Sequence, residues 1–197
     1  MKIQKNTLSN PLSYLLLMFI LLSFLACNSQ DKKTEKTDSA ITKTELEPPS
    51  VDIHTATFLG NTKALKQHIE AGTDLNVKDQ YGSTPLIIAT TFGKTDMAKT
   101  LINAGADLHI MNNEGATPLH IASFFCRTDI VKALLEKGAD KTLKNNYDST
   151  PLQSVSGAFS DAKPIYDQLS KDLGPLGLKF DYKHLETERP IIAELLK

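Results

Sequence analysis

Histidines are the side chains of this chain that could act as general bases or zinc ligands at neutral pH. They are scattered along the sequence: His54, His68, His109, His120 and His184. No two of them have a short helical spacing such as His-x3-His, which zinc sites commonly use. The sequence also has no Gly-rich phosphate loop after a predicted strand and no Gly-x-Ser-x-Gly nucleophile elbow. We therefore expect no catalytic residue, no metal site, no cofactor and no enzymatic activity.

The thiol of Cys126 is a second candidate for chemistry. It stands beside Arg127, and a nearby cation lowers the pKa of a thiol and makes the sulfur more reactive. On this interpretation Cys126 is a redox sensor. The alternative is that Cys126 is a small buried hydrophobic residue at a tight turn.

A third polar group lies near the C-terminal end of the chain. Its members are Asp181, Tyr182, His184, Glu186 and Glu188. Carboxylates, an imidazole and a phenol in so short a segment are side chains from which an active site or a small-ligand site is built. A solvated polar surface has the same composition, so both interpretations stand.

The elements that position these side chains follow from an internal repeat. Thr-Pro-Leu recurs at one constant interval, at 84–86, 117–119 and 150–152. A second pattern, Gly-x-Asp, keeps the same interval at its aspartates, Asp74, Asp107 and Asp140. An internal period of about 33 residues indicates a stacked solenoid of short supersecondary units. The recurring aspartates therefore belong to the repeat and are not interpreted as catalytic acids.

One repeat, residues 79–111, predicts two short helices joined by turns. An Asp-Gln-Tyr-Gly turn precedes Thr84, which stands at a helix N-cap. Pro85 at the first helical position has no N–H to leave unpaired. Gly93 ends this helix, and Gly105 ends the next one. A helix pair this short cannot bury its apolar face alone, so neighbouring repeats must stack.

The repeat resembles the ankyrin repeat, whose first helix begins Thr-Pro-Leu-His-x-Ala and whose second half carries Leu-Leu and Gly-Ala-Asp. Thr117-Pro118-Leu119-His120 and Gly138-Ala139-Asp140 match this pattern. The resemblance implies an all-α solenoid of helix-turn-helix pairs with β-turn or hairpin loops, and a structural hydrogen bond from His120 to a neighbouring loop. It implies an ankyrin repeat domain of about four repeats, including modified ends, over 51–175: 51–78, 79–111, 112–144 and 145–175.

The C-terminal part of the chain is expected to close the stack, because a terminal repeat needs a shielded outer face. Pro164 is expected to open a helix. Residues 176–197 form a predicted capping tail that ends in a helix around 190–196. We expect four of its apolar residues to cover the end of the solenoid: Ile191, Ile192, Leu195 and Leu196.

Residues 1–26 have the layout of a secretory signal peptide. Two lysines precede an apolar stretch, 12–25, that is too short for a comfortable membrane span. The Phe-Leu-Ala-Cys sequence ending at Cys27 resembles a bacterial lipobox, which implies that Cys27 becomes the lipidated first residue. Residues 27–50 then form a polar, disordered tether. An uncleaved N-terminal anchor is the alternative.

The predicted location is the bacterial envelope. Asn28 does not resemble the aspartate that retains many lipoproteins on the inner membrane, so we expect a lipid anchor in the outer membrane, on its periplasmic face or at the cell surface. Without the leader the chain carries 20 basic and 23 acidic residues. This mildly acidic balance gives no electrostatic reason to expect nucleic-acid binding.

A partner-binding surface is predicted where the first helix of each repeat ends and at the tips of the turns, since these positions line the concave face of ankyrin stacks. Leu59, Phe92 and Phe125 recur at the interval of the repeat and should form a continuous column. Exposed apolar columns suit a protein partner. The alternative is that these side chains pack between repeats or under the hairpins. The candidate partner-binding residues are Phe58, Leu59, Tyr81, Thr91, Phe92, Glu114, Phe124, Phe125 and Tyr147.

Together these features predict a membrane-anchored ankyrin-repeat scaffold of the bacterial envelope that binds another protein through its concave face. The partner is a protein of unknown identity, and the membrane is reached through the lipid on Cys27. The alternative is an accessory or inhibitory subunit of an envelope enzyme, or a stress-protection factor.

Overall fold

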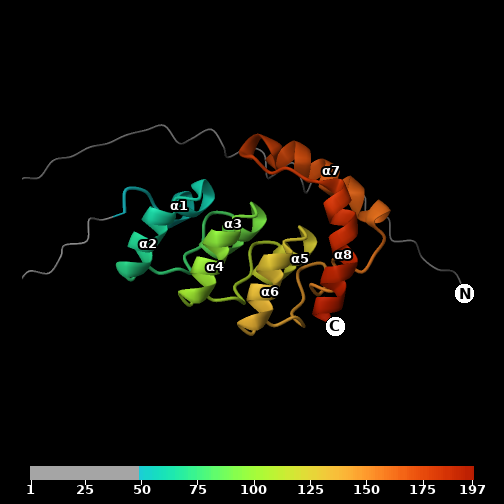
Figure 1. Cartoon of the computed structure of the whole chain (residues 1–197), viewed down its shortest axis with the longest axis horizontal. Coiled ribbons are helices and arrows are strands. Elements are labelled where there is room, and N and C mark those ends of the chain that lie inside the picture. The colour runs from blue at the N-terminus through green and yellow to red at the C-terminus, as the bar shows by residue number, and fades with distance from the viewer. Residues whose placement is uncertain (1–48) are drawn as a thin grey trace, which may run out of the picture. The chain divides into compact units, whose positions relative to one another are not determined.

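The structure, a computed structural model, describes residues 49–197, and this part of the chain is helical with no β-strand. The predicted signal peptide, Cys27 and most of the tether lie outside the described residues. In chain order the elements are α1 (Ile53–Leu59), α2 (Thr62–Glu70), α3 (Pro85–Thr91), α4 (Thr95–Asn103), α5 (Pro118–Phe124), α6 (Thr128–Glu136), α7 (Phe159–Leu173), the 3-10 helix η2 (Gly174–Leu176) and α8 (Tyr182–Leu196) (Figure 1). Within residues 49–197, none of these helices has both the length and the apolar character needed to cross a membrane.

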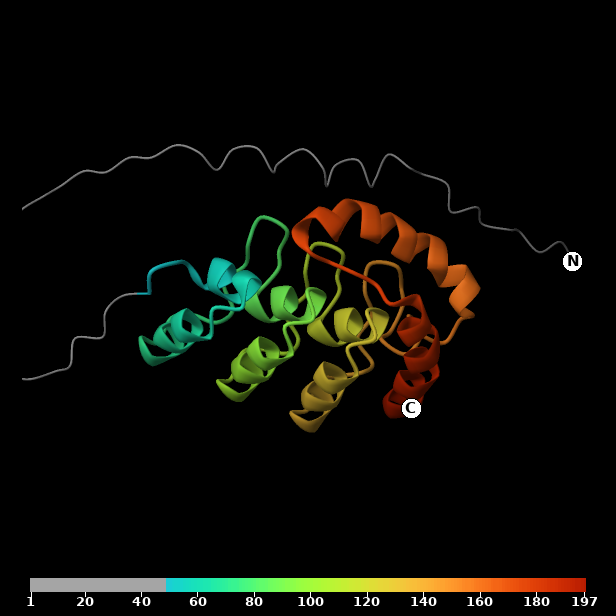
Figure 2. The ribbon, with the colours of Figure 1, turned by 45° about the horizontal axis from the view of Figure 1, so that its top comes forward.

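The first six helices form three successive pairs, and the pairs stack side by side (Figures 1 and 2). Helix α3 packs between α1 and α5, and α4 packs on α6. Fully buried aliphatic side chains from all three pairs fill the space between them, among them Leu65, Leu86, Leu101, Leu119 and Ile130. The stacking that the short helices require is therefore present, and the predicted all-α repeat solenoid is confirmed.

The first helix of each pair begins at a side-chain cap. Thr84 Oγ1 accepts a hydrogen bond from the Ile87 N–H at 3.3 Å, and Pro85 occupies the first turn. At the next repeat the Thr117 hydroxyl and the His120 ring cap each other's backbone N–H groups. These caps satisfy amide groups that have no partner inside a helix. The predicted N-cap role of Thr84 is confirmed.

The same helices end in the left-handed backbone region. Gly60 and Gly93 have φ of 72° and 63° and follow α1 and α3. At the corresponding position after α5, the residue is Cys126, with φ of 53°. A side chain in this region is unfavourable compared with glycine. The third repeat therefore holds a strained, non-glycine turn beneath the C-terminal part of the chain.

The loops between repeats are joined to one another by hydrogen bonds with a 33-residue separation. Asn113 Nδ2 donates to the Gln80 carbonyl at 3.3 Å, and Asn146 Nδ2 donates to the Asn113 carbonyl at 2.9 Å. Gly115 faces this junction: a Cβ on it would lie 2.8 Å from the backbone nitrogen of Asn146. The turn glycine is thus needed for close approach of neighbouring loops as well as for its φ of 72°.

The fourth repeat departs from the pattern of the other three. Thr150 and Gln153 form reciprocal capping hydrogen bonds, yet the segment that follows is a series of turns. Ser154 and Ser156 donate from their hydroxyls to backbone carbonyls three and four residues earlier. Such side-chain hydrogen bonds, followed by Gly157, compete with helix formation. The expectation that Pro164 opens the next helix is wrong, because α7 begins at Phe159 and Pro164 lies inside it.

Helices α7 and α8 with η2, residues 159–196, form what we call the C-terminal cap. Helix α8 packs against α5 and α6 and closes that end of the stack (Figure 1). Of the four residues expected to cover the end, Ile192 and Leu196 are buried and Leu195 is half-buried, which confirms the covering role of the first two. Ile191 is 48% exposed, so its expected burial is wrong. The helix also starts two turns earlier than predicted, at Tyr182.

Candidate protein-binding surface

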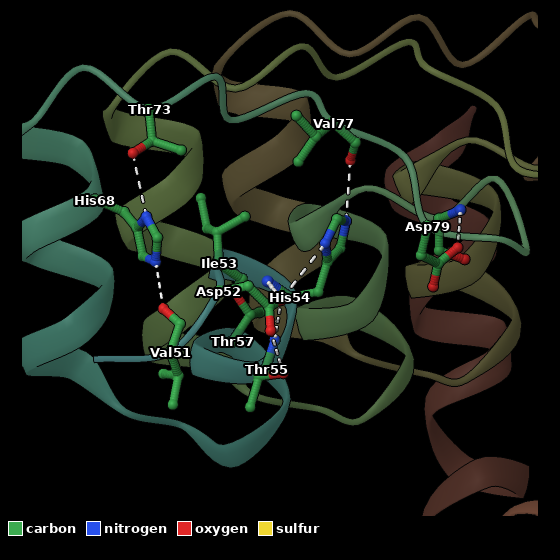
Figure 3. Close-up of polar contacts among 11 residues, drawn as sticks. Val51, Asp52, Ile53, His54, Thr55, Thr57, His68, Thr73, Val77 and Asp79 are labelled. Atoms are coloured by element: carbon green, nitrogen blue, oxygen red, sulfur yellow. Dashed lines mark hydrogen bonds and ion pairs between the residues drawn. The ribbon is translucent and has the colours of Figure 1, made fainter. Parts of the chain in front are cut away.

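Two histidines of the first repeat hold backbone groups in place (Figure 3). His68 bridges the Thr73 hydroxyl at 3.1 Å and the Val51 carbonyl at 2.8 Å. His54 lies 3.0 Å from the Val77 carbonyl through Nε2. Figure 3 shows the two rings directed at these separate partners. Both side chains therefore tie chain segments together.

His120 has a similar structural role in the third repeat. Its Nδ1 accepts from the Thr117 backbone N–H at 3.3 Å, so the proton is on Nε2, which donates to the Ser149 carbonyl at 3.0 Å. Burial of the ring lowers its pKa, because the charged imidazolium would lose its hydration. The predicted hydrogen bond from His120 to a neighbouring loop is confirmed.

The remaining histidines also bind backbone groups. His109 Nε2 accepts from the Asp140 N–H at 3.1 Å, and His184 Nε2 lies 3.3 Å from the Cys126 carbonyl. Among residues 49–197, no three His, Cys, Asp or Glu side chains are grouped closely enough to hold a metal ion.

Cys126 is buried, and its Sγ lies 3.7 Å from the Leu185 carbonyl of the cap. Burial raises the pKa of the thiol to about 11, and the opposing effects of Arg189 and Arg127 are smaller. Arg127 does lower the pKa of this thiol, as expected, but burial outweighs it, so a net lowering of the pKa is not found. The structure supports the interpretation of Cys126 as a small buried residue.

The polar residues of the C-terminal segment have separate structural partners. Asp181 caps α8 by accepting from two backbone N–H groups. The Tyr182 hydroxyl donates to Asp167 at 2.8 Å, and Glu188 accepts from the Thr128 hydroxyl at 2.6 Å. They do not converge on one point where a substrate could be held. The solvated-surface interpretation thus fits this segment better than an active site.

The predicted aromatic column is open over the first two repeats. Leu59 is 63% exposed, and Phe58 and Phe92 are half-buried. The Phe58 and Phe92 rings meet edge to face with centroids 4.8 Å apart, so the two repeats share one apolar surface. Thr91 lies beside them, half-buried, with its hydroxyl bonded to the Ile87 carbonyl.

The column is covered at the third repeat by the cap. Phe125 is 5% exposed and stacks on Phe180 with centroids 5.7 Å apart. Phe124 stacks on Tyr166 at 4.7 Å. The expectation of a continuous exposed column is therefore wrong at Phe125, because Phe180 packs on it, while Phe124 stays half-buried beside Tyr166. The sequence feature that could have indicated this covering is the presence of two aromatic residues, Tyr166 and Phe180, downstream of the repeats.

Comparison with known proteins identifies the repeated part of the chain. A family model described as ankyrin repeats, in three copies, matches residues 53–145. Residues 53–145 are ankyrin repeats. No curated protein matches the sequence. The chain is similar to the crystal structure of the ankyrin repeat domain of Bcl-3, described as a unique member of the IkappaB protein family, with 30% identity and a TM-score of 0.51. That match covers 52% of this chain and 45% of the Bcl-3 chain.

The three ankyrin repeats correspond to the helix pairs α1–α2, α3–α4 and α5–α6, and the C-terminal cap lies beyond the matched residues. A stack of ankyrin repeats is a protein-interaction scaffold and is typically not an enzyme. With 455 chains of solved structures matching, the fold by itself identifies no partner.

The ankyrin loops add a second row of candidate residues. Tyr81, Glu114 and Tyr147 occupy the same position in successive loops of the repeat. Tyr81 is half-buried, whereas Glu114 and Tyr147 are exposed. We call the set Phe58, Leu59, Tyr81, Thr91 and Phe92 the open aromatic face, since the cap does not cover it. Phe125 is covered by the cap, and Phe124 is half-buried beside Tyr166.

Basic side chains border the open aromatic face at the turns between paired ankyrin helices. Lys94 and Arg127 occupy equivalent positions, directly before α4 and α6. The Arg127 guanidinium lies against Gly93, because a Cβ built on Gly93 would be 2.9 Å from Arg127 Cζ. Arg127 Nη2 donates to the Thr91 carbonyl at 3.4 Å. Within the described part of the chain, Arg127 has no carboxylate within ion-pair distance.

Proposed function

We propose that this protein is a lipid-anchored scaffold of the bacterial outer membrane, on its periplasmic face or at the cell surface, that binds another protein through the concave face of its ankyrin repeats. The partner contacts the open aromatic face and the loop tips. The exposed Leu59 beside the Phe58–Phe92 pair is the observation that carries this proposal. An apolar side chain that is 63% exposed gains stability when a partner covers it.

The chemistry of the face indicates what the partner presents. Phe58, Leu59 and Phe92 favour an aliphatic or aromatic side chain. The neighbouring cations Lys94 and Arg127 favour a carboxylate beside it, because Arg127 has no acidic partner among residues 49–197. An acidic segment with an apolar anchor therefore fits this surface. A partner of ordinary size would bury about 800 Å² here.

Site-specific photocrosslinking in intact cells tests the proposal. A photoreactive phenylalanine analogue replaces Leu59 in one variant and Lys132, which is exposed on α6, in a matched control. We expect Leu59 to crosslink to a defined protein and Lys132 not to do so. In a further variant the photoreactive analogue replaces Tyr81. Adding Phe92→Ser to that variant should abolish its crosslink to the partner. Identical crosslinks from positions 59 and 132 would contradict binding by the open aromatic face.

The identity of the crosslinked protein then distinguishes the kinds of scaffold. A crosslinked envelope enzyme whose rate changes when this protein is deleted would make it an accessory or inhibitory subunit. A structural partner would make it an assembly scaffold.

The lipid anchor is tested separately at Cys27. The wild-type chain is expected to incorporate labelled fatty acid and to sediment with outer membranes. Cys27→Ala should lose the label and the outer-membrane location. Label that persists in the variant would show that the lipid is not on Cys27.

A further inference from the structure

A cleft of about 480 Å³ lies between the turns that follow the third ankyrin repeat and the second half of α8. Its apolar walls include Leu152, Val155, Phe159 and Ala193. The volume is within the range of about 300–1,000 Å³ that small-molecule sites occupy. This cleft is separate from the open aromatic face, which belongs to the first two repeats.

Arg189 lines the cleft and is the most unusual charged group in this part of the protein. Its side chain is 4% exposed. Nη1 donates to the Tyr166 hydroxyl at 3.1 Å, and Nη2 donates to the Gly157 carbonyl at 3.2 Å. Its Nε is buried and donates to no atom of residues 49–197. Both of its acceptors are neutral, so the positive charge has no counter-ion.

A buried guanidinium without a counter-ion is costly, because it has lost its hydration and gained no opposite charge. The other buried Nε without an acceptor, that of Arg127, belongs to a residue that is only half-buried. Arg189 is more deeply buried, and it lines the cleft with the small part of its surface that stays exposed. Its environment is therefore incomplete in a way that an anion would correct.

The carboxylates nearest in sequence do not supply that anion. Glu194 pairs with Lys197, and Glu188 accepts from the Thr128 hydroxyl. Glu186 is exposed on α8, at the edge of the cleft. None of them is within ion-pair distance of Arg189 in the described part of the chain. Gly157, whose carbonyl accepts from Nη2, also lines the cleft, and a Cβ on it would meet no atom within 4 Å.

We propose that this cleft binds a carboxylate joined to an apolar group, with Arg189 as its charge partner. A guanidinium binds a carboxylate through parallel N–H bonds, for which Nε and a terminal nitrogen are a suitable pair. The apolar walls hold the rest of the ligand. A single negative charge fits better than a phosphate dianion, because Glu186 lies at the edge of the cleft, whereas the charge of Glu194 is balanced by Lys197. A small organic acid and the C-terminus of a peptide share this chemistry.

Calorimetric titration of the full-length chain tests this proposal with four probes. They are 3-phenylpropionate, its alcohol analogue 3-phenylpropanol, N-acetyl-Ala-Phe with a free C-terminus, and the same peptide with a C-terminal amide. We expect each acid to bind about tenfold or more tightly than its neutral analogue, as a charge-assisted hydrogen-bonded pair implies. The tighter of the two acids identifies the source, either a free acid or a peptide terminus. Equal binding of acids and neutral analogues, or no binding by either acid, would overturn the proposal.

Variants separate this role from a structural one. Arg189→Met should lose the preference for the acids while melting no lower than the wild type, because the unpaired charge has been removed. Glu186→Gln should bind the acids more tightly, because it removes a repulsive charge from the edge of the cleft. Lys132→Met, a loss of charge on the exposed face of α6, is the matched control and should leave binding unchanged. If Arg189→Met does not fold, weaker or unchanged acid binding by Glu186→Gln overturns the proposal by itself.

Discussion

The Tyr166 hydroxyl donates a hydrogen bond of 2.6 Å to the carbonyl oxygen of Phe124, 42 residues earlier in the chain. The two rings also stack, with centroids 4.7 Å apart. Phe124 is the last residue of α5, where carbonyl groups have no partner within the helix. One side chain of the cap therefore satisfies this polar group and covers the ring beside it. Tyr166 therefore covers part of the aromatic surface of the third ankyrin repeat.

Loss of the Tyr166 ring should loosen the cap. Tyr166→Ala is expected to lower the free energy of unfolding by about 3–5 kcal/mol, as for other large-to-small changes of buried aromatic residues. Tyr166→Phe keeps the stacking and should cost about 1–2 kcal/mol, because it removes the hydrogen bond to the Phe124 carbonyl and the one from Arg189 Nη1. Urea denaturation measures both. Ile165→Ala, on the exposed side of α7, is the control, and a loss equal to that of Tyr166→Ala would contradict the role of the ring.

The loop junction should be sensitive to a methyl group at Gly115. Gly72 and Gly115 have nearly the same left-handed backbone, with φ of 70° and 72°. A Cβ on Gly72 meets nothing within 4 Å, whereas one on Gly115 would lie 2.8 Å from Asn146 N. Gly72→Ala should cost about 1–2 kcal/mol from backbone conformation alone. Gly115→Ala should cost about 1–3 kcal/mol more, because it also overpacks the junction. Equal losses in thermal denaturation would show that the loops separate freely.

The buried thiol should make the protein less stable in alkali. Burial raises the pKa of Cys126 from 9.0 to about 11. Between these values the unfolded chain releases the thiol proton and the folded chain keeps it, so stability falls as pH rises. The slope is at most about 1.4 kcal/mol per pH unit for one group. Cys126→Ala should show a shallower loss from pH 9 to pH 11. The same slope in both proteins would mean that the thiol does not remain protonated.

His120 should make the protein less stable in acid. Burial lowers its pKa in the folded state below 6.5. Below that pH the unfolded chain binds a proton that the folded chain excludes, so stability is lost as pH falls. His120→Gln retains a residue suited to the capping box with Thr117 but does not titrate. We expect it to be about 1 kcal/mol less stable at pH 7 and to lose less stability between pH 6.5 and pH 5. An unchanged dependence on pH, measured by urea denaturation, would contradict a buried neutral imidazole.

Short-range physical rules explain why much of the fold was predictable. The N-cap of Thr84 depends on Ile87, within the first turn of the same helix, and the turn at Gly93 depends on its own φ. Each such rule involves residues within one helical turn. The same residues recur in successive repeats, so the sequence shows each local pattern more than once. The sequence therefore determined the helix pairs and their stacking, and it placed Leu59 and Phe92 at equivalent positions of the repeat. It did not determine the fourth repeat, whose Thr150 cap is followed by serines and glycine that favour turns.

The tertiary structure alone decided which part of the predicted column is exposed and where charge is buried. Phe125 is covered by Phe180 from far downstream in the sequence, and Arg189 is enclosed by Tyr166 and the Gly157 carbonyl. These contacts join segments that are far apart in the sequence. The local sequence pattern of each segment is compatible with other ways of packing. They form because α7 and α8 must bury apolar faces of their own, and the uncovered end of the ankyrin stack is the surface on which they do so. Local periodicity describes which face of a helix is apolar, but only packing of the complete chain determines what lies against it.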